Sequence, residues 1–155
     1  MAPRNSADFH LWNLCHLWLN ASAMNNDPTQ TDCGSFLHKE ITQAIIGAAF
    51  EVHNHLGYGY LERVYQRAMQ VELRLRGLEA ALEQPIQVHY KGEVVGDYVA
   101  DLFVERKVMV ELKVSPEYRS ADEAQLINEL VSTGVQVGLL INFGRERVEF
   151  KRLAH

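Results

Sequence analysis

Two carboxylates and a lysine stand out in a stretch that is otherwise rich in valine and leucine: Asp101, Glu111 and Lys113. Residues 99–114 predict two strands joined by a short polar turn at residues 105–107. Because side chains alternate along a strand, Glu111 and Lys113 are expected on the same face. A three-residue turn would also place Asp101 directly opposite Glu111.

Two carboxylates that face each other across a hairpin repel, which predicts a compensating cation. Lys113 is one candidate. A divalent metal such as Mg²⁺ or Mn²⁺ is a better one, since both ions prefer oxygen ligands. The alternative is that Asp101, Glu111 and Lys113 only form the solvated polar face of an edge hairpin, which is common in antiparallel sheets.

Two further polar residues are candidates for the same site. Glu62 falls in the first turn of a predicted helix, where the helix dipole favours a carboxylate even without a catalytic role. Gln125 lies on a later predicted helix, on the side away from its apolar stripe, which is typical of a surface amide.

The chemistry that needs such a set is metal-assisted phosphodiester hydrolysis. Two or three carboxylates would hold Mg²⁺, and the metal would activate water and neutralise the leaving oxygen, while Lys113 would orient the water or stabilise developing charge. No Ser-His-Asp or Cys-His arrangement is indicated, and the sequence contains no G-x-x-x-x-G-K-[ST] phosphate loop.

The spacing of apolar residues predicts an α/β (α+β) fold of eight elements in the order ααβββαββ. An almost wholly apolar strand after the third helix indicates a right-handed parallel crossover, so we expect a mixed sheet flanked by helices. The predicted helices are 37–55, 61–76 and 121–133, and the predicted strands are 86–90, 94–104, 108–114, 135–142 and 148–153.

Local signals refine these helices. Ser120 with Glu123 predicts a capping box at the third helix, and Gly77 and Gly134 predict the ends of the second and third. The residues expected on the apolar stripes are Ile41, Ile45, Ala48, Ala49 and Val52 in the first helix, Val64, Ala68, Val71 and Leu75 in the second, and Ala124, Ile127, Leu130 and Val131 in the third.

Length and composition fit one domain with a substantial core. The chain has 155 residues, 47% of them hydrophobic, and a net charge of −5, so any nucleic-acid site must be local. No apolar run is long enough to cross a membrane. Because nothing in the chain requires an oxidising compartment, we expect a cytoplasmic protein.

The first 35 residues differ in composition from the rest, and we expect a flexible extension before a domain at 36–155. Residues 9–19 are rich in Trp and Leu, and three interpretations are open. They belong to a signal peptide, to an amphipathic helix that binds a membrane or partner, or to a segment upstream of a natural start at Met24. We favour the last.

Residues 59–65, GYLERVY, match the G-x-x-E-x-x-Y motif, and Asp101 followed by Glu111-Leu112-Lys113 matches D…(D/E)-x-K. With IIGAAFEVHNHLG before them and GLLINFG at 138–144, residues 37–153 resemble the GxxExxY family of the PD-(D/E)xK nuclease superfamily. The resemblance implies a restriction-endonuclease-like core. It also implies a Mg²⁺- or Mn²⁺-dependent nuclease with DNA as a more typical substrate than RNA.

The resemblance also assigns roles. Glu62, Asp101 and Glu111 would be the catalytic carboxylates and metal ligands, Lys113 the catalytic lysine, and Gly59 and Tyr65 structural motif residues. Gln125 resembles the glutamine of a Q-x-x-x-Y motif, although Glu129 stands at the tyrosine position, and Ala100 replaces the proline before the aspartate.

Two functional hypotheses follow. The first is a nuclease that binds nucleic acid at a local site and no membrane, with a homodimer as a possible assembly. The second is a catalytically silent nuclease-like module for binding or protein interaction, which the acidic net charge of −5 favours.

Overall fold

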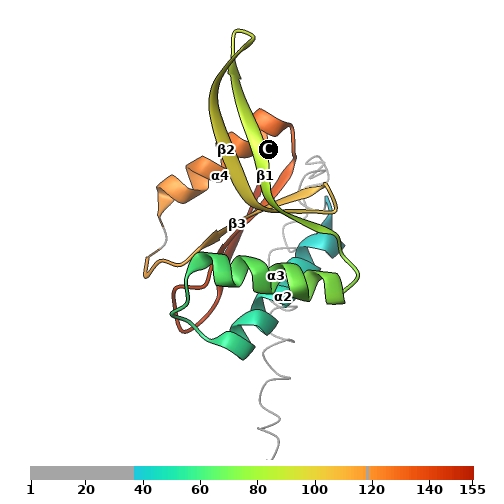
Figure 1. Cartoon of the computed structure of the whole chain (residues 1–155), viewed down its shortest axis with the longest axis vertical. Coiled ribbons are helices and arrows are strands. Elements are labelled where there is room, and N and C mark those ends of the chain that lie inside the picture. The colour runs from blue at the N-terminus through green and yellow to red at the C-terminus, as the bar shows by residue number, and fades with distance from the viewer. Residues whose placement is uncertain (1–36, 118) are drawn as a thin grey trace, which may run out of the picture. The chain divides into compact units, whose positions relative to one another are not determined.

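The computed structural model describes residues 37–117 and 119–155. The interpretations of residues 1–35 therefore concern residues outside this range. Within it, the order of elements is the one that the sequence predicts (Figure 1). The elements are α2 (Lys39–Leu56), α3 (Glu62–Leu75), β1 (Ala80–Tyr90), β2 (Glu93–Val104), β3 (Val108–Lys113), α4 (Ser120–Thr133), β4 (Val137–Asn142) and β5 (Glu149–Ala154).

The five strands form one mixed sheet in the order β1-β2-β3-β4-β5. Strand β3 pairs antiparallel with β2 and parallel with β4, as the predicted crossover requires. Helices α2 and α3 pack on one face of the sheet and α4 on the other. This is the expected α+β fold, and it is consistent with a restriction-endonuclease-like core. None of its described helices combines the length and apolar character needed to cross a membrane.

Strand β3 lies in the middle of the sheet and is buried on both faces. Val108 and Val110 join the core under α2 and α3, whereas Met109 joins the core under α4. The interpretation of this stretch as an edge hairpin with a solvated face is therefore wrong. Because α4 covers the second face, a polar residue there, such as Glu111, is buried.

The β2–β3 hairpin has the predicted register for three residue pairs and then separates. Val104, Phe103 and Leu102 pair with Val108, Met109 and Val110, but the ladder ends there, so the expected pairing of Asp101 with Glu111 is not formed. The β1–β2 ribbon diverges at this point and projects past α4 (Figure 1). Strand β1 also begins at Ala80, earlier than predicted.

The buried side of α2 is largely as predicted, since Ile45, Ala48, Ala49 and Val52 are all in the core. Helix α3 forms where the sequence predicts it, and Ala68 of the predicted apolar stripe packs against the core, but the rest of that stripe does not face the core. This helix buries Tyr65, Gln66, Met69 and Leu73, and it leaves two expected core residues exposed: Val71 by 46% and Leu75 by 74%. Two large side chains, Tyr65 and Met69, fill the space against the sheet, and this rotates the helix away from its aliphatic stripe.

Helix α4 also differs from its prediction. Leu126, Glu129 and Leu130 are buried, while Val131 and Ala124 are exposed. The helix begins one residue earlier than expected, so Ser120 is its first residue. Arg119 is the N-cap and makes no side-chain capping bond. Glycines end α3 and α4 as predicted, since Gly77 and Gly134 have positive φ angles of 79° and 71°.

A buried asparagine fixes the chain where it leaves β3. Asn142 Oδ1 accepts hydrogen bonds from the backbone N–H groups of Ser115 and Gly144, and Asn142 Nδ2 donates to the Ser115 carbonyl at 2.8 Å. Residue 144 is therefore pressed against Ser115, and a Cβ there would overlap the backbone nitrogen and carbonyl of Ser115. Only glycine fits, and this contact holds the segment that follows Lys113.

We predict that Gly144→Ala lowers the free energy of unfolding by about 2 kcal/mol or more, because backbone must move to admit the methyl group. Urea denaturation measures this. The matched control is Gly47→Ala in the middle of α2, where a Cβ meets only the flexible guanidinium of Arg76 at 3.0 Å. That change should leave stability equal or raise it by up to about 1 kcal/mol. Equal losses in both variants would contradict the close approach at Gly144.

Candidate active site

The loop before α3 is held by hydrogen bonds to the Tyr65 hydroxyl, and it positions the start of the helix. Gly57 and Gly59 have positive φ angles of 73° and 106°, which glycine adopts without strain. The Tyr65 hydroxyl donates to the Gly57 carbonyl at 2.8 Å and accepts from the Tyr60 N–H at 3.3 Å. The Tyr65 ring stacks on Phe143, with centroids 4.5 Å apart. Gly59 and Tyr65, the two motif residues, therefore hold the loop that leads into the helix.

Asp101 lies where β2 leaves β3, and its side chain takes the place of the missing strand pairing. Asp101 Oδ2 accepts a hydrogen bond of 2.7 Å from the Leu112 N–H. Gln66 Nε2 donates to the Asp101 carbonyl at 3.1 Å and reaches Oδ1 at 3.4 Å. Burial raises the pKa of Asp101, although the Leu112 hydrogen bond and the charge of Lys113 act in the opposite direction. The carboxylate is thus oriented by α3 and β3 together.

Glu111 is the most deeply buried of the predicted site carboxylates, with 4% of the residue exposed. Its Oε1 accepts from Lys113 Nζ at 2.6 Å and from Gln125 Nε2 at 3.1 Å. Its Oε2 is buried without a hydrogen-bond partner among the described residues. Burial, with repulsion from Asp101 and Glu129, raises the pKa of Glu111 to about 7 despite the contact with Lys113.

Lys113 and Glu62 complete the group. Burial disfavours the Lys113 ammonium, but its hydrogen bond to Glu111 and the charges of Glu111, Glu62 and Asp101 outweigh this and raise its pKa. Burial and the charge of Asp101 raise the pKa of Glu62, while Lys113 and the backbone N–H of Val114 lower it. The predicted residues Glu62, Asp101, Glu111 and Lys113 therefore come together from three separate elements.

The position of Gln125 relative to the apolar stripe predicts a side chain that points to solvent. In the structure, the Gln125 side chain points to the sheet instead. Its Nε2 bridges Glu111 Oε1 at 3.1 Å and Glu129 Oε1 at 2.9 Å. The expectation of a surface amide is wrong because α4 packs with Leu126 and Leu130 inward, which turns Gln125 and Glu129 to the same side.

Two residues of this site were not among the candidates from sequence: Gln66, and Glu129, which was noted only as a departure from the Q-x-x-x-Y motif. Each lies four residues after a predicted site residue on the same helix, Gln66 after Glu62 and Glu129 after Gln125, so the helical period could have found them. Glu129 is only 3% exposed and its Oε2 has no partner among the described residues. Burial raises the pKa of Glu129, and its hydrogen bond with Gln125 lowers it.

The carboxylates fit a divalent metal ion. No group of three or more His, Cys, Asp or Glu side chains in residues 37–117 and 119–155 forms a ready metal cluster. Mg²⁺, however, is commonly held by one or two protein carboxylates together with waters and substrate phosphates. Asp101 and Glu111 meet that requirement, since the buried Oε2 of Glu111 lacks a partner and both pKa values are raised. A cation there would give the Glu111 Oε2 a partner and would lower the pKa of both carboxyl groups.

A family model described as "PD-(D/E)XK nuclease superfamily" matches residues 39–153 of the chain. No curated protein matches the chain. A solved structure described as "Crystal structure of SSO0001" has a TM-score of 0.49 and 14% sequence identity, and the match covers 94% of this chain and 77% of the other. That likeness is too distant to bear on function.

We predict that Glu129→Gln stabilises the metal-free protein by about 1 kcal/mol, because it removes a buried charge while leaving an oxygen to accept from Gln125. The folded pKa of Glu129 is raised, so the carboxylate destabilises the fold above that pKa. The advantage of the variant should disappear as the pH falls below the unfolded pKa of about 4.3. Thermal denaturation in EDTA at pH 8 and pH 4 measures both effects.

The control for this prediction is Glu123→Gln, which removes a carboxylate of the same α4 helix that pairs on the surface with Lys151 at 2.6 Å. Its stability should change by less than about 0.5 kcal/mol. A loss of stability in Glu129→Gln at pH 8 would show that the carboxylate is stabilised by its surroundings.

Proposed function

Because the chain belongs to the PD-(D/E)XK nuclease superfamily, as the family model over residues 39–153 shows, we propose that it is a metal-dependent nuclease that cleaves phosphodiester bonds in DNA. The observation that carries this proposal is the buried Oε2 of Glu111. It has no partner among the described residues, and its carboxyl group lies in contact with Lys113 and near Asp101.

The proposal gives each side chain a role. Asp101 and Glu111 would hold Mg²⁺ or Mn²⁺, and the ion would supply a positive charge that neutralises the scissile phosphate. Glu62 would become a further ligand only after a movement of its side chain, because no three such carboxylates are clustered among the described residues. Leu112 N–H and Gln66 keep the Asp101 carboxylate in one orientation. Gln125 does the same for Glu111, since its amide fixes Oε1 and leaves Oε2 free to bind.

Lys113 acts on the reacting groups. In the metal-free protein, the hydrogen bond to Glu111 and the charges of Glu111, Glu62 and Asp101 raise the pKa of Lys113, so its ammonium is a hydrogen-bond donor. Three donor hydrogens on one nitrogen allow Nζ to keep its contact with Glu111 Oε1 at 2.6 Å while donating to the attacking water or to a phosphate oxygen. Lys113 thereby orients the water and stabilises negative charge in the transition state.

Several finer assignments belong to this proposal. Membership of the GxxExxY family rests on Gly59, Glu62 and Tyr65. The choice of DNA over RNA rests on the resemblance alone. A cytoplasmic location, a homodimer, and a domain at 36–155 that follows an extension at 1–35 stay predictions.

We predict that Glu111→Ala and Lys113→Ala each reduce Mn²⁺-dependent cleavage of DNA by at least about 10²-fold, because each loses a group that acts on the transition state. Cleavage of single- and double-stranded DNA and RNA oligonucleotides with Mn²⁺ measures this and also identifies the substrate.

The matched controls are Glu123→Ala and Lys151→Ala, which break a surface ion pair of the same residue types and the same 2.6 Å length. Both should cleave at the rate of the parent protein. Equal cleavage by parent, Glu111→Ala and Lys113→Ala would trace the activity to a contaminant and refute the proposal.

We also predict that Mg²⁺ or Mn²⁺ raises the melting temperature of the parent protein and that Asp101→Asn abolishes this rise, because binding to the folded state alone stabilises it. A thermal shift titration with each metal measures the effect. An undiminished rise in Asp101→Asn would place the metal elsewhere. A metal-dependent rise without cleavage of any nucleic acid would support the silent module instead.

A further inference from the structure

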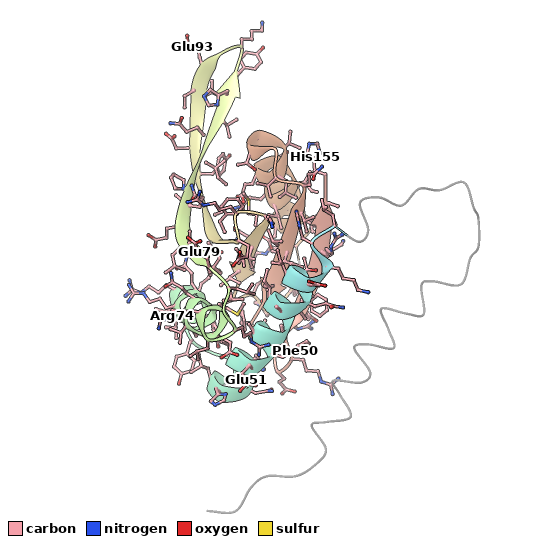
Figure 2. All side chains as sticks on the ribbon, turned by 90° about the vertical axis from the view of Figure 1, so that its right-hand side faces the viewer. Phe50, Glu51, Arg74, Glu79, Glu93 and His155 are labelled. Carbon is pink, nitrogen blue, oxygen red and sulfur yellow. The ribbon has the colours of Figure 1, made fainter. Side chains whose placement is uncertain are left out.

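Three arginines of α3 share one exposed side of the helix: Arg63, Arg67 and Arg74. Their spacing of four and seven residues repeats with the helical period, so their side chains leave the helix in nearly the same direction. That side is distinct from the buried side, which carries Tyr65, Met69 and Leu73. We call these three arginines the α3 basic strip. Figure 2 shows Arg74 at the outer side of the helix.

The α3 basic strip has no partner among residues 37–117 and 119–155. None of its three guanidinium groups makes a hydrogen bond or ion pair with a described residue. The next arginine on the helix behaves differently, since Arg76 Nε pairs with Glu72 Oε1 at 2.8 Å and Arg76 donates to the Gly47 carbonyl. This side of α3 therefore carries three positive charges without a partner among the described residues, whereas the chain as a whole has a net charge of −5.

The strip begins at the candidate active site. Arg63 follows Glu62 directly, and the electrostatic coupling of Glu62 to Asp101 and Lys113 places this end of α3 at the site. From Arg63 to Arg74 the helix rises about 16 Å, which corresponds to roughly five phosphates of one strand of a duplex. The positive charges therefore lead away from the carboxylates in a line, with a length suited to a nucleic-acid backbone.

From these observations we propose that the α3 basic strip binds the phosphate backbone of the nucleic-acid substrate and guides it to the active site. The inference rests on the proposed nuclease function and specifies where the substrate lies. Arginine suits this role because its planar guanidinium donates two hydrogen bonds to one phosphate. Phosphate contacts of this kind supply affinity without reading sequence. The local strip also explains how an acidic protein attracts a polyanion.

The test measures binding without cleavage. Fluorescence anisotropy of labelled single- and double-stranded DNA oligonucleotides is followed in EDTA over a range of salt concentrations, with the full chain. Arg63→Gln, Arg67→Gln and Arg74→Gln should each weaken binding and each lower the salt dependence, the slope of log K against log salt, by about one. The double variant Arg63→Gln/Arg67→Gln should bind about tenfold more weakly at low salt.

Two control variants separate this role from a general effect of charge. Lys91→Gln removes one positive charge at the tip of the β1–β2 ribbon, far from α3, and should bind like the parent (Figure 1). Arg67→Lys keeps the charge and should retain most of the affinity. Unchanged melting temperatures would confirm that the variants are folded.

The outcomes distinguish the strip from the nuclease proposal. Equal affinity and equal salt slopes in the parent and the three arginine variants would overturn the strip, while cleavage by the parent would keep the nuclease function. The same loss of affinity in Lys91→Gln as in Arg67→Gln would also overturn it. Weakened binding in the arginine variants of a parent that never cleaves would support the strip and refute the nuclease function.

Discussion

The burial of a carboxylate next to other carboxylates is the constraint on which the site depends. Glu111 lies on a central strand that is covered on both faces, so its charge is poorly solvated by water. Repulsion from Asp101 and Glu129 adds to this cost, and Lys113 offsets only part of it. Such an arrangement persists only where many contacts of the surrounding structure hold it in place. Buried charge of this kind is typical of sites that bind a cation or perform acid–base chemistry.

The rest of the fold holds these charged groups in place from several directions. Asn142 and Gly144 fix the chain just after Lys113, and the Phe143 N–H donates to the Lys113 carbonyl at 2.8 Å. Tyr65 fixes the loop before Glu62 and stacks on Phe143, so the start of α3 and the end of β4 share one aromatic contact. Tyr65 of α3 and Phe143, which follows strand β4, therefore hold the same part of the site in place, although they lie far apart in sequence.

Glu129 gives the site a feature that its family resemblance does not predict. A carboxylate at the tyrosine position of the Q-x-x-x-Y pattern accepts the Gln125 amide, and that amide then also donates to Glu111. The departure at residue 129 thus preserves the orientation of Gln125 while adding a second buried charge with an unpartnered oxygen.

The sequence by itself determined the order of the elements, the mixed sheet and the hairpin register from Leu102 to Val104, and it singled out four residues whose side chains lie together at the candidate site. These follow from periodicity, turn residues and motif spacing, which are local properties of the chain. It did not determine which side of α3 and α4 faces the core, because that depends on the large side chains that fill the space under each helix. Only the tertiary structure decided the direction of Gln125, the burial of Glu111 under α4, and the separation of β2 from β3 at Asp101. All three follow from packing between elements that are distant in sequence.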